Sequence, residues 1–207
     1  MTNNNIVSVP EIDPGSLSAD DPRMPMARAV ALAGAVISRV NSENETNPSP
    51  CPQWDAKAIA GHLVAILDRL AGFPGGIDAM TLPLVVEGVD PDQWPEVLET
   101  AAHAVHQAWS DDAVLGQEMV LPFATLPGAA TLGIYTAELL THIWDLAKAI
   151  AVEPEWHEGD VQQSLEIVQF GIPAEPRGGE FPFGAVTATD DDAPTIDKLA
   201  AWFGRRV

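Results

Sequence analysis

Glu138 and His142 place a carboxylate and an imidazole four residues apart, in a run from 136 to 148 that contains neither glycine nor proline. On a helix, residues with this spacing lie one turn apart on the same side, so both side chains can address a common point. This is the spacing of two ligands of a divalent metal ion. Two protein ligands hold such an ion weakly, so a third is needed. His62 is the best candidate, because it is the only ionisable residue on the core-side edge of another amphipathic run.

The same pattern also fits an ordinary solvated helix face. At about 100° per residue, the polar residues of this run fall in one sector and the apolar residues in another. The polar sector contains Glu138, Thr141, His142, Asp145 and Lys148. For His62 the alternative is a core histidine that is hydrogen-bonded to a backbone carbonyl or a carboxylate. Spacing alone leaves both interpretations open.

The composition favours one globular core and disfavours anionic partners. The chain has 207 residues, 46% of them hydrophobic, which is enough to bury one sizeable core and excludes disorder throughout. Acidic residues outnumber basic residues by 30 to 10, giving a net charge of −20. This charge repels phosphate backbones and anionic lipids. We therefore expect neither a nucleic-acid nor a membrane partner; homodimerisation through apolar faces stays open.

Targeting and membrane signals are missing from the sequence pattern. No apolar run approaches the roughly 20 residues that cross a bilayer, and residues 1–21 lack the basic start and apolar core of a secretory signal. The single cysteine, Cys51, cannot form an internal disulfide, in keeping with a reducing compartment. The sequence therefore predicts a cytoplasmic protein.

Hydrophobic periodicity predicts an all-α protein with minor β structure. Residues 1–20 are expected to form a flexible tail and residues 21–207 a single domain. Helix signals predict helices over about 22–44, from Asp55 to the glycines at 72–76, and over 91–110, 129–151, 159–170 and 194–205. Short strands are expected over 118–123 and 183–189, with a loop bounded by Pro122 and Pro127, whereas 80–86 fits either an extended piece or a helical turn. Four long helices imply an antiparallel bundle, in which facing helices build cofactor sites.

Several common catalytic motifs are absent. The sequence contains no glycine-rich phosphate loop, no G-x-S-x-G elbow and no paired-cysteine zinc knuckle. A nucleotide-binding or serine-hydrolase interpretation therefore has no support.

Two blocks of the sequence carry a family resemblance. The first runs from Ser49-Pro50-Cys51-Pro52-Gln53-Trp54-Asp55 into Gly61-His62-Leu63. The second runs from Leu121-Pro122-Phe123 through Leu126-Pro127-Gly128 into Glu138-Leu139-Leu140-Thr141-His142-Ile143-Trp144-Asp145-Leu146-Ala147. Together they resemble the mycothiol-dependent maleylpyruvate isomerase N-terminal-domain family within the DinB-like metalloproteins. The similarity, including the order of the helices, spans about residues 23–205.

The resemblance implies a DinB-like four-helix bundle, with a C-terminal extension of short strands and helices, that holds a divalent metal ion at one end. The family's metal ligands match His62, Glu138 and His142. Zinc is the first expectation and nickel the alternative. Relatives known to be enzymes are thiol-dependent transferases, isomerases and hydrolases, so the resemblance implies a low-molecular-weight thiol such as mycothiol acting on a small electrophilic substrate. The alternative is a non-enzymatic ligand-binding or sensor bundle with a structural or vestigial metal site.

The chain departs from the family pattern in one respect. The isomerase-like enzymes carry a further C-terminal domain, whereas this sequence ends at Val207. Maleylpyruvate isomerisation itself is therefore not expected. Few cations lie near the proposed site along the chain to bind carboxylates of a substrate or thiol; the nearest are Lys57, Arg69 and Lys148.

Four further residues are candidates for lesser roles. Asp145, one turn beyond His142, is a candidate to orient its imidazole from the second shell of the metal, with a solvated helix acid as the alternative. Cys51 precedes a helix N-terminus, which favours thiolate, but no basic residue adjoins it, and a packing role is preferred. His106 is a weak candidate for a fourth ligand. Trp54 is assigned to the core or to a pocket wall.

Overall fold

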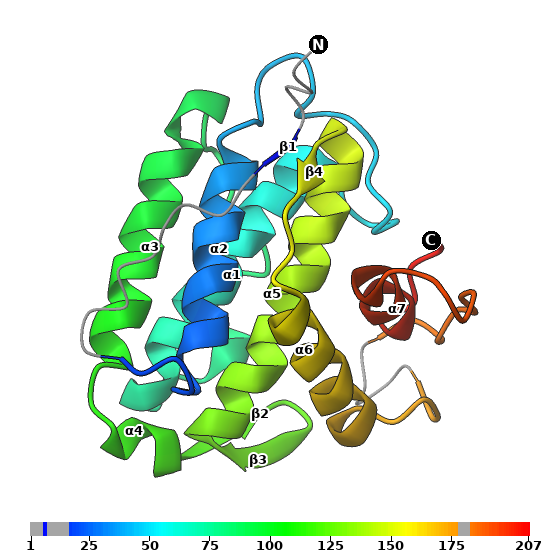
Figure 1. The fold of residues 1–207 in the computed structure, drawn as a ribbon. Coiled ribbons are helices and arrows are strands. Elements are labelled where there is room, and N and C mark those ends of the chain that lie inside the picture. The colour runs from blue at the N-terminus through cyan, green and yellow to red at the C-terminus, as the bar shows by residue number, and fades with distance from the viewer. Residues whose placement is uncertain (1–5, 8–16, 178–182) are drawn as a thin grey trace.

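Four helices form the bundle in this computed structural model, which describes residues 6–7, 17–177 and 183–207. They are α1 (Met24–Ile37), α2 (Ala56–Gly72), α3 (Trp94–Ala108) and α5 (Gly128–Ile150). Helix α5 packs against α1 and α2, and α2 packs against α3 (Figure 1). Two shorter helices, α6 (Glu158–Gly171) and α7 (Thr195–Trp202), pack against each other and against α5. The prediction of an all-α bundle with minor β structure is confirmed.

Helix α2 begins and ends where its sequence signals predict. The Asp55 carboxylate accepts a hydrogen bond from the backbone N–H of Ala58, which satisfies one of the unpaired donors at the helix start. At the other end a short 3-10 turn, η1 (Phe73–Gly75), leads to Gly76, whose φ of 73° closes the helix in the left-handed conformation. Most residues of α2 are buried, because the helix is covered by both α3 and α5.

Helix α5 is the longest helix and the most completely buried. It follows Pro127 and ends at Ala151, which adopts φ 56°. Ile143 and Leu146 on α5 and Leu63 and Ile66 on α2 are fully buried in the shared core. Burial of such apolar side chains is the main favourable contribution to folding, about 1.5–3 kcal/mol for each. The polar residues of α5 must therefore find partners inside the protein.

The β structure consists of two small two-stranded sheets in the described part of the chain. Strand β2 (Glu118–Leu121) pairs antiparallel with β3 (Ala124–Pro127), and Leu121 stands opposite Ala124. The predicted loop between Pro122 and Pro127 is therefore wrong: Pro122 and Phe123 reverse the chain, and the next four residues form a strand. Strand β1 (Ile6–Val7) pairs in parallel with β4 (Glu153–Pro154). Short turns of helix, α4 (Ala113–Gly116), η2 (Ala79–Thr81) and η3 (Pro91–Gln93), complete the elements.

Two predicted elements differ from the structure. The first helix ends at Ile37 rather than near residue 44, because Asn41 and Asn44 hydrogen-bond to nearby backbone groups and replace helical hydrogen bonds with turns. Residues 183–189 alternate in polarity but form no strand. The backbone N–H of Thr187 donates to the carbonyl oxygen of Ala201 on α7, so the neighbour of this segment is a helix and not a strand. Of segment 80–86, residues 80 and 81 belong to the 3-10 turn η2, and residues 82–86 continue as irregular chain.

The first described residues lie beside β4 and α1, whereas the C-terminal segment contacts α5 through Arg205 and Asp145. Ile6–Val7 joins β4 just after α5, while residues 1–5 and 8–16 of the expected tail lie outside the described residues. The division into tail and domain stays a prediction.

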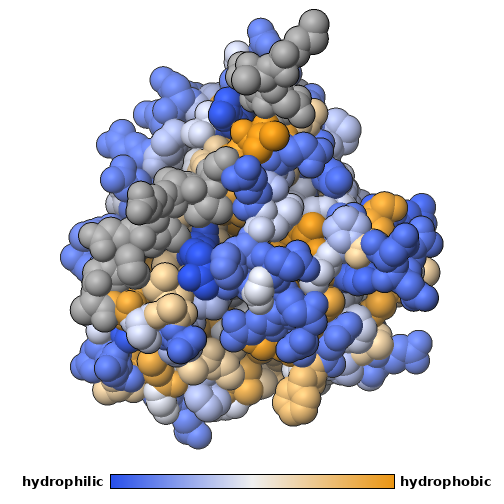
Figure 2. All heavy atoms as spheres, in the orientation of Figure 1, coloured by the Kyte–Doolittle hydropathy of each residue, from blue (hydrophilic) through white to orange (hydrophobic). Residues whose placement is uncertain are grey.

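Hydrophilic side chains cover most of the face drawn in Figure 2, with scattered apolar patches between them. None of the helices in the described part of the chain combines the length and apolar character needed to cross a membrane.

Gly61 allows the chain after η2 to dock closely on α2. The N–H of Val86 donates to the carbonyl oxygen of Gly61 at 3.1 Å, and a Cβ atom at Gly61 would lie only 2.2 Å from the carbonyl oxygen of Val86. Such an approach is possible only without a side chain. The glycine thereby fixes the position of Leu84, whose carbonyl oxygen reaches the next residue of α2, His62.

We expect Gly61→Ala to lower the free energy of unfolding by about 2 kcal/mol, because the added methyl group forces the docked segment away from α2. Gly75→Ala is the matched control, since a Cβ atom there meets nothing within 4 Å; its change should stay within about 0.5 kcal/mol. Urea unfolding measures both. Equal stabilities of the two variants would contradict the close docking of this segment.

Candidate metal centre

The packing of α2 against α5 brings together His62, Glu138 and His142. One potential ligand atom from each lies within 4.8 Å of the others. The two imidazole rings have their centroids 4.4 Å apart, and His62 Nε2 lies 3.6 Å from Glu138 Oε1. Their sector of α5 is not a solvated face, because Thr141, His142 and Asp145 are buried. The arrangement can hold a divalent cation; the role of these residues as ligands stays a prediction.

Both imidazoles turn Nδ1 towards an oxygen atom. His62 Nδ1 donates to the carbonyl of Leu84 at 2.6 Å, and since a carbonyl can only accept, this contact sets the proton on Nδ1. His142 Nδ1 lies 3.0 Å from Asp145 Oδ2, although the N–H direction is off the axis of a good hydrogen bond. In the neutral form of each ring that carries its proton on Nδ1, Nε2 keeps the lone pair. Ligand histidines in metal sites are oriented in this way by oxygen atoms behind them.

The charge states of the cluster suit a cation. Burial and the neighbouring His62 lower the pKa of His142 to about 4, against the attraction of Asp145, so its imidazole is neutral at pH 7. Burial alone would raise the pKa of Glu138, but His62, His142 and Arg69 outweigh it and hold this pKa below its ordinary value. A neutral imidazole and an ionised carboxylate are the forms that bind metal ions.

Asp145 is held by an arginine from the C-terminal end of the chain. Its carboxylate is fully buried, and Arg205 donates to both of its oxygens at 2.8–3.2 Å through Nε and Nη2. Burial tends to raise the pKa of Asp145, yet His142 and Arg205 hold it below the ordinary value. The alternative of a solvated helix acid is wrong. Sequence reasoning missed Arg205, because nothing in its local pattern links it to a residue 60 positions earlier.

Trp54 covers one side of the cluster, whereas Trp144 lies in the core. The Trp54 ring lies 4.3 Å from His62 and 5.6 Å from His142, measured between centroids. The indole N–H of Trp144 instead donates to Asp197 on α7 at 2.8 Å. Trp54 is therefore a wall of the candidate site, and it shields the two imidazoles from solvent.

Two other candidates lie outside the cluster or lack the required reactivity. Cys51 is buried, and burial raises the pKa of its thiol, the opposite of the thiolate character expected from a helix N-terminus. His106 is exposed on α3 and is not part of the group that comes together. The predicted preference for a packing role of Cys51 agrees with its surroundings.

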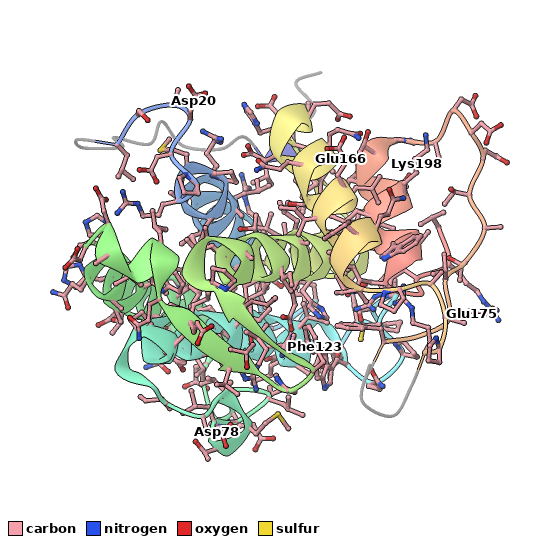
Figure 3. All side chains as sticks on the ribbon, turned by 90° about the horizontal axis from the view of Figure 1, so that it is seen from below. Asp20, Asp78, Phe123, Glu166, Glu175 and Lys198 are labelled. Atoms are coloured by element: carbon pink, nitrogen blue, oxygen red, sulfur yellow. The ribbon has the colours of Figure 1, made fainter. Side chains whose placement is uncertain are left out.

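A cavity of about 510 Å³ opens beside Glu138. Its wall is mainly apolar and includes Leu82, Leu84, Phe123, Ile134 and Phe203. Figure 3 shows Phe123 at the end of the β2–β3 hairpin that faces the C-terminal segment, where its ring centroid lies 6.3 Å from that of Phe183. The hairpin and the C-terminal segment therefore close one side of the cavity next to the cluster.

Of the three cations expected near the site, only Arg69 borders this cavity. Lys57 pairs with Glu45 at 2.9 Å, and Lys148 lies over the ring of Trp144. Each of these two lysines is occupied away from the cluster, so neither is available to a ligand in the cavity.

Comparison with known proteins places this fold among solved structures. Two crystal structures match this chain with a TM-score of 0.52 and 16% sequence identity. One is of mycothiol-dependent maleylpyruvate isomerase, and the other is of a variant of that enzyme in which alanine replaces a histidine. The match covers 73% of this chain and 68% of the isomerase chain. The chain has the fold of mycothiol-dependent maleylpyruvate isomerase. The resemblance in fold predicted from the two sequence blocks is thereby confirmed.

The sequence comparisons add relatives without an assigned function. No family model matches the sequence. Two uncharacterised proteins of Mycobacterium tuberculosis, from strains CDC 1551 and H37Rv, are each 24% identical over 191 residues, which is 90% of this chain and 99% of theirs. These relatives match the chain over almost their whole length but suggest no function for it. The chemistry of this protein therefore has to follow from the residues of its candidate site.

We expect Arg205→Leu to lower the free energy of unfolding by about 3 kcal/mol, because it leaves the buried Asp145 carboxylate without its cation. The neighbouring Arg206 is exposed and has the same charge, so Arg206→Leu should change stability by less than about 0.5 kcal/mol. Urea unfolding of both variants at pH 7 makes the comparison. Similar losses for the two would show that the contact with Asp145 is not what stabilises the C-terminal segment.

Proposed function

We propose that this protein binds one divalent metal ion, zinc in the first instance, and uses it with a low-molecular-weight thiol such as mycothiol to transform a small electrophilic substrate. The observation that carries the proposal is the convergence of His62, Glu138 and His142, with both Nε2 lone pairs available, beside an apolar cavity. The fold of a mycothiol-dependent isomerase supports the thiol as cosubstrate. Nickel is the alternative metal.

The donor set fits a divalent ion of this kind. Two neutral imidazoles and one carboxylate are typical ligands of catalytic zinc, which keeps a further position open. The distance of 3.6 Å from His62 Nε2 to Glu138 Oε1 is too long for a hydrogen bond. It is close to the separation of about 3.4 Å expected for two ligands that each bind a tetrahedral ion at roughly 2.1 Å. The pair is thus spaced for an ion between them.

The chemistry divides between the ion and the chain. A divalent ion at this position supplies the positive charge that favours the thiolate form of a thiol at neutral pH. Glu138 contributes one negative charge to offset that of the ion, while Leu84 O and Asp145 hold the two imidazoles in their binding orientation. Trp54 and the apolar wall exclude water from the reacting groups, which strengthens electrostatic interactions there.

Purified protein without a tag should retain about one equivalent of metal, and His142→Ala should lose it, because two remaining ligands hold an ion weakly. Elemental analysis after dialysis measures the metal. His106→Ala is the matched control, since this exposed histidine lies outside the cluster and should leave the content unchanged. If His142→Ala retains the full equivalent, the ligand assignment is wrong.

Turnover of electrophilic substrates should require both the metal and the added thiol. Screening with mycothiol present and absent, and with Glu138→Gln beside the unmodified protein, separates an enzyme from a binding or sensor protein. We expect Glu138→Gln to reduce the rate at least about tenfold, because the neutral amide is a weaker ligand and offsets no charge. Metal binding without any thiol-dependent turnover would instead favour the non-enzymatic alternative.

A further inference from the structure

We propose that the cavity beside Glu138 binds a small apolar monocarboxylate, and that Arg69 recognises its carboxylate group. The inference deepens the proposed function by naming a class of substrate, and it rests on that function only for the claim that the ligand reacts. Binding itself depends on Arg69, which is not one of the proposed metal ligands, and on a cavity whose wall includes one of them, Glu138.

Arg69 is a buried cation that pairs with no carboxylate of the described residues. Its side chain on α2 borders the cavity although the residue is only 6% exposed. Nη2 donates to the carbonyl oxygen of Pro83 at 2.6 Å, and Nε reaches that of Ala79 at 3.4 Å. Both acceptors are neutral. Within the part of the chain that the structure describes, no carboxylate forms an ion pair with Arg69, and Nη1 donates to no protein atom.

A buried charge of this kind is costly unless an opposite charge compensates for it. Glu138 lies on the same cavity wall and is near enough for Arg69 to lower its pKa, but it forms no ion pair with the guanidinium. Its carboxylate is instead turned towards His62 at 3.6 Å. A ligand carboxylate that reached Nη1 would supply the missing anion and form a charge-assisted hydrogen bond.

The rest of the cavity specifies an apolar body with a single negative charge. Leu82, Ile134, Phe123 and Phe203 contribute apolar surface, and Arg69 is the only cation on this wall among the described residues. A second anionic group would meet the Glu138 carboxylate and the strongly negative protein, whose net charge is −20. A volume of about 510 Å³ lies within the range of small-molecule sites.

The entrance of the cavity is apolar, like most of its wall. Met80 and Leu84 line the cavity and are 69% and 63% exposed, which is unusual for apolar side chains of this size. They present apolar surface to solvent at the edge of the cavity, where the hydrocarbon part of an entering ligand would make its first contact. Together with Arg69 inside, this gives the site an apolar edge and a cationic interior.

Calorimetric titration with octanoate, 1-octanol and octylamine tests the inference, because the three probes share one hydrocarbon chain and differ in the charge of the head group. Octanoate should bind most tightly and octylamine least. Arg69→Gln should weaken octanoate at least about tenfold and leave 1-octanol nearly unchanged. An octanoate affinity that equals that of 1-octanol, or that survives Arg69→Gln, overturns the proposal.

A second pair of variants decides the matter if Arg69→Gln fails to fold, since Arg69 also holds two backbone carbonyls. Met80→Glu and Met80→Gln place side chains of nearly equal shape at the exposed edge of the cavity. The added charge should weaken octanoate about threefold relative to the glutamine variant without changing 1-octanol. Equal octanoate affinities for the two variants would place the carboxylate elsewhere and overturn the proposal.

Titrating the His142→Ala variant separates this inference from the proposed function, because a carboxylate is also able to ligate a metal ion. Octanoate should bind His142→Ala with an affinity that still depends on Arg69. If octanoate binding disappears with the metal and is indifferent to Arg69, the carboxylate is a metal ligand and the Arg69 site is wrong, while the metal centre stands. If binding persists and metal is absent from the unmodified protein, the metal centre fails and the Arg69 site stands.

Discussion

Two buried imidazoles each face an oxygen atom with Nδ1, and much of the surrounding fold serves to hold those two oxygens in place. Leu84 supplies one from a segment without regular structure, and this segment is fixed on α2 only because Gly61 leaves room for it. Asp145 supplies the other from α5, and Arg205 reaches it from the far end of the chain. A buried polar group without a partner would destabilise the fold. The need to satisfy these groups therefore links the orientation of the candidate ligands to distant parts of the structure.

The need of buried polar groups for partners also bears on the charges around the cluster. The charged groups around the cluster are two acids and two arginines, of which Asp145 and Arg69 are buried and Glu138 and Arg205 half-buried, in a protein with a net charge of −20. Arg205 donates to Asp145 through Nε and Nη2, whereas Arg69 donates, within the described part of the chain, to two backbone carbonyls. Arg205 thus holds the carboxylate that faces His142, and Arg69 keeps hydrogen-bond donors for a ligand in the cavity. This asymmetry is the physical basis for assigning them different roles.

The cavity brings three distant parts of the chain into one site. The segment after η2, the β2–β3 hairpin and the C-terminal segment each contribute apolar side chains to its wall, while α2 and α5 contribute the charged ones. The helices of the bundle are packed through a close apolar core and have little room to change. The segments between and after them are the parts where sequence changes would alter the shape of the cavity with less effect on the bundle.

Much of the bundle could be predicted from the sequence, because its signals are local. Apolar residues at helical spacing, the cap at Asp55 and the uninterrupted run around Glu138 fix where α2 and α5 lie along the chain. The same spacing places Glu138 and His142 on one face of a helix. The amphipathic run around His62 made this residue the best candidate for a third ligand, and the family resemblance agreed with that choice. The end of α1 and the β2–β3 hairpin were predicted less well, because side-chain contacts of Asn41 and Asn44 and the pairing of short strands compete with simple periodicity.

Only the tertiary structure decided which polar groups are buried together. The sequence placed Asp145 on a face that would look the same if it were solvated, and it offered no reason to connect Arg205 with that face. Burial of Asp145, its contact with Arg205 and the incomplete pairing of Arg69 depend on how α2, α5 and the C-terminal segment pack. Local sequence determined the helices and the spacing of candidate ligands, since backbone geometry acts over a few residues. The charges that surround them were set by contacts between residues far apart in the chain, which no local pattern encodes.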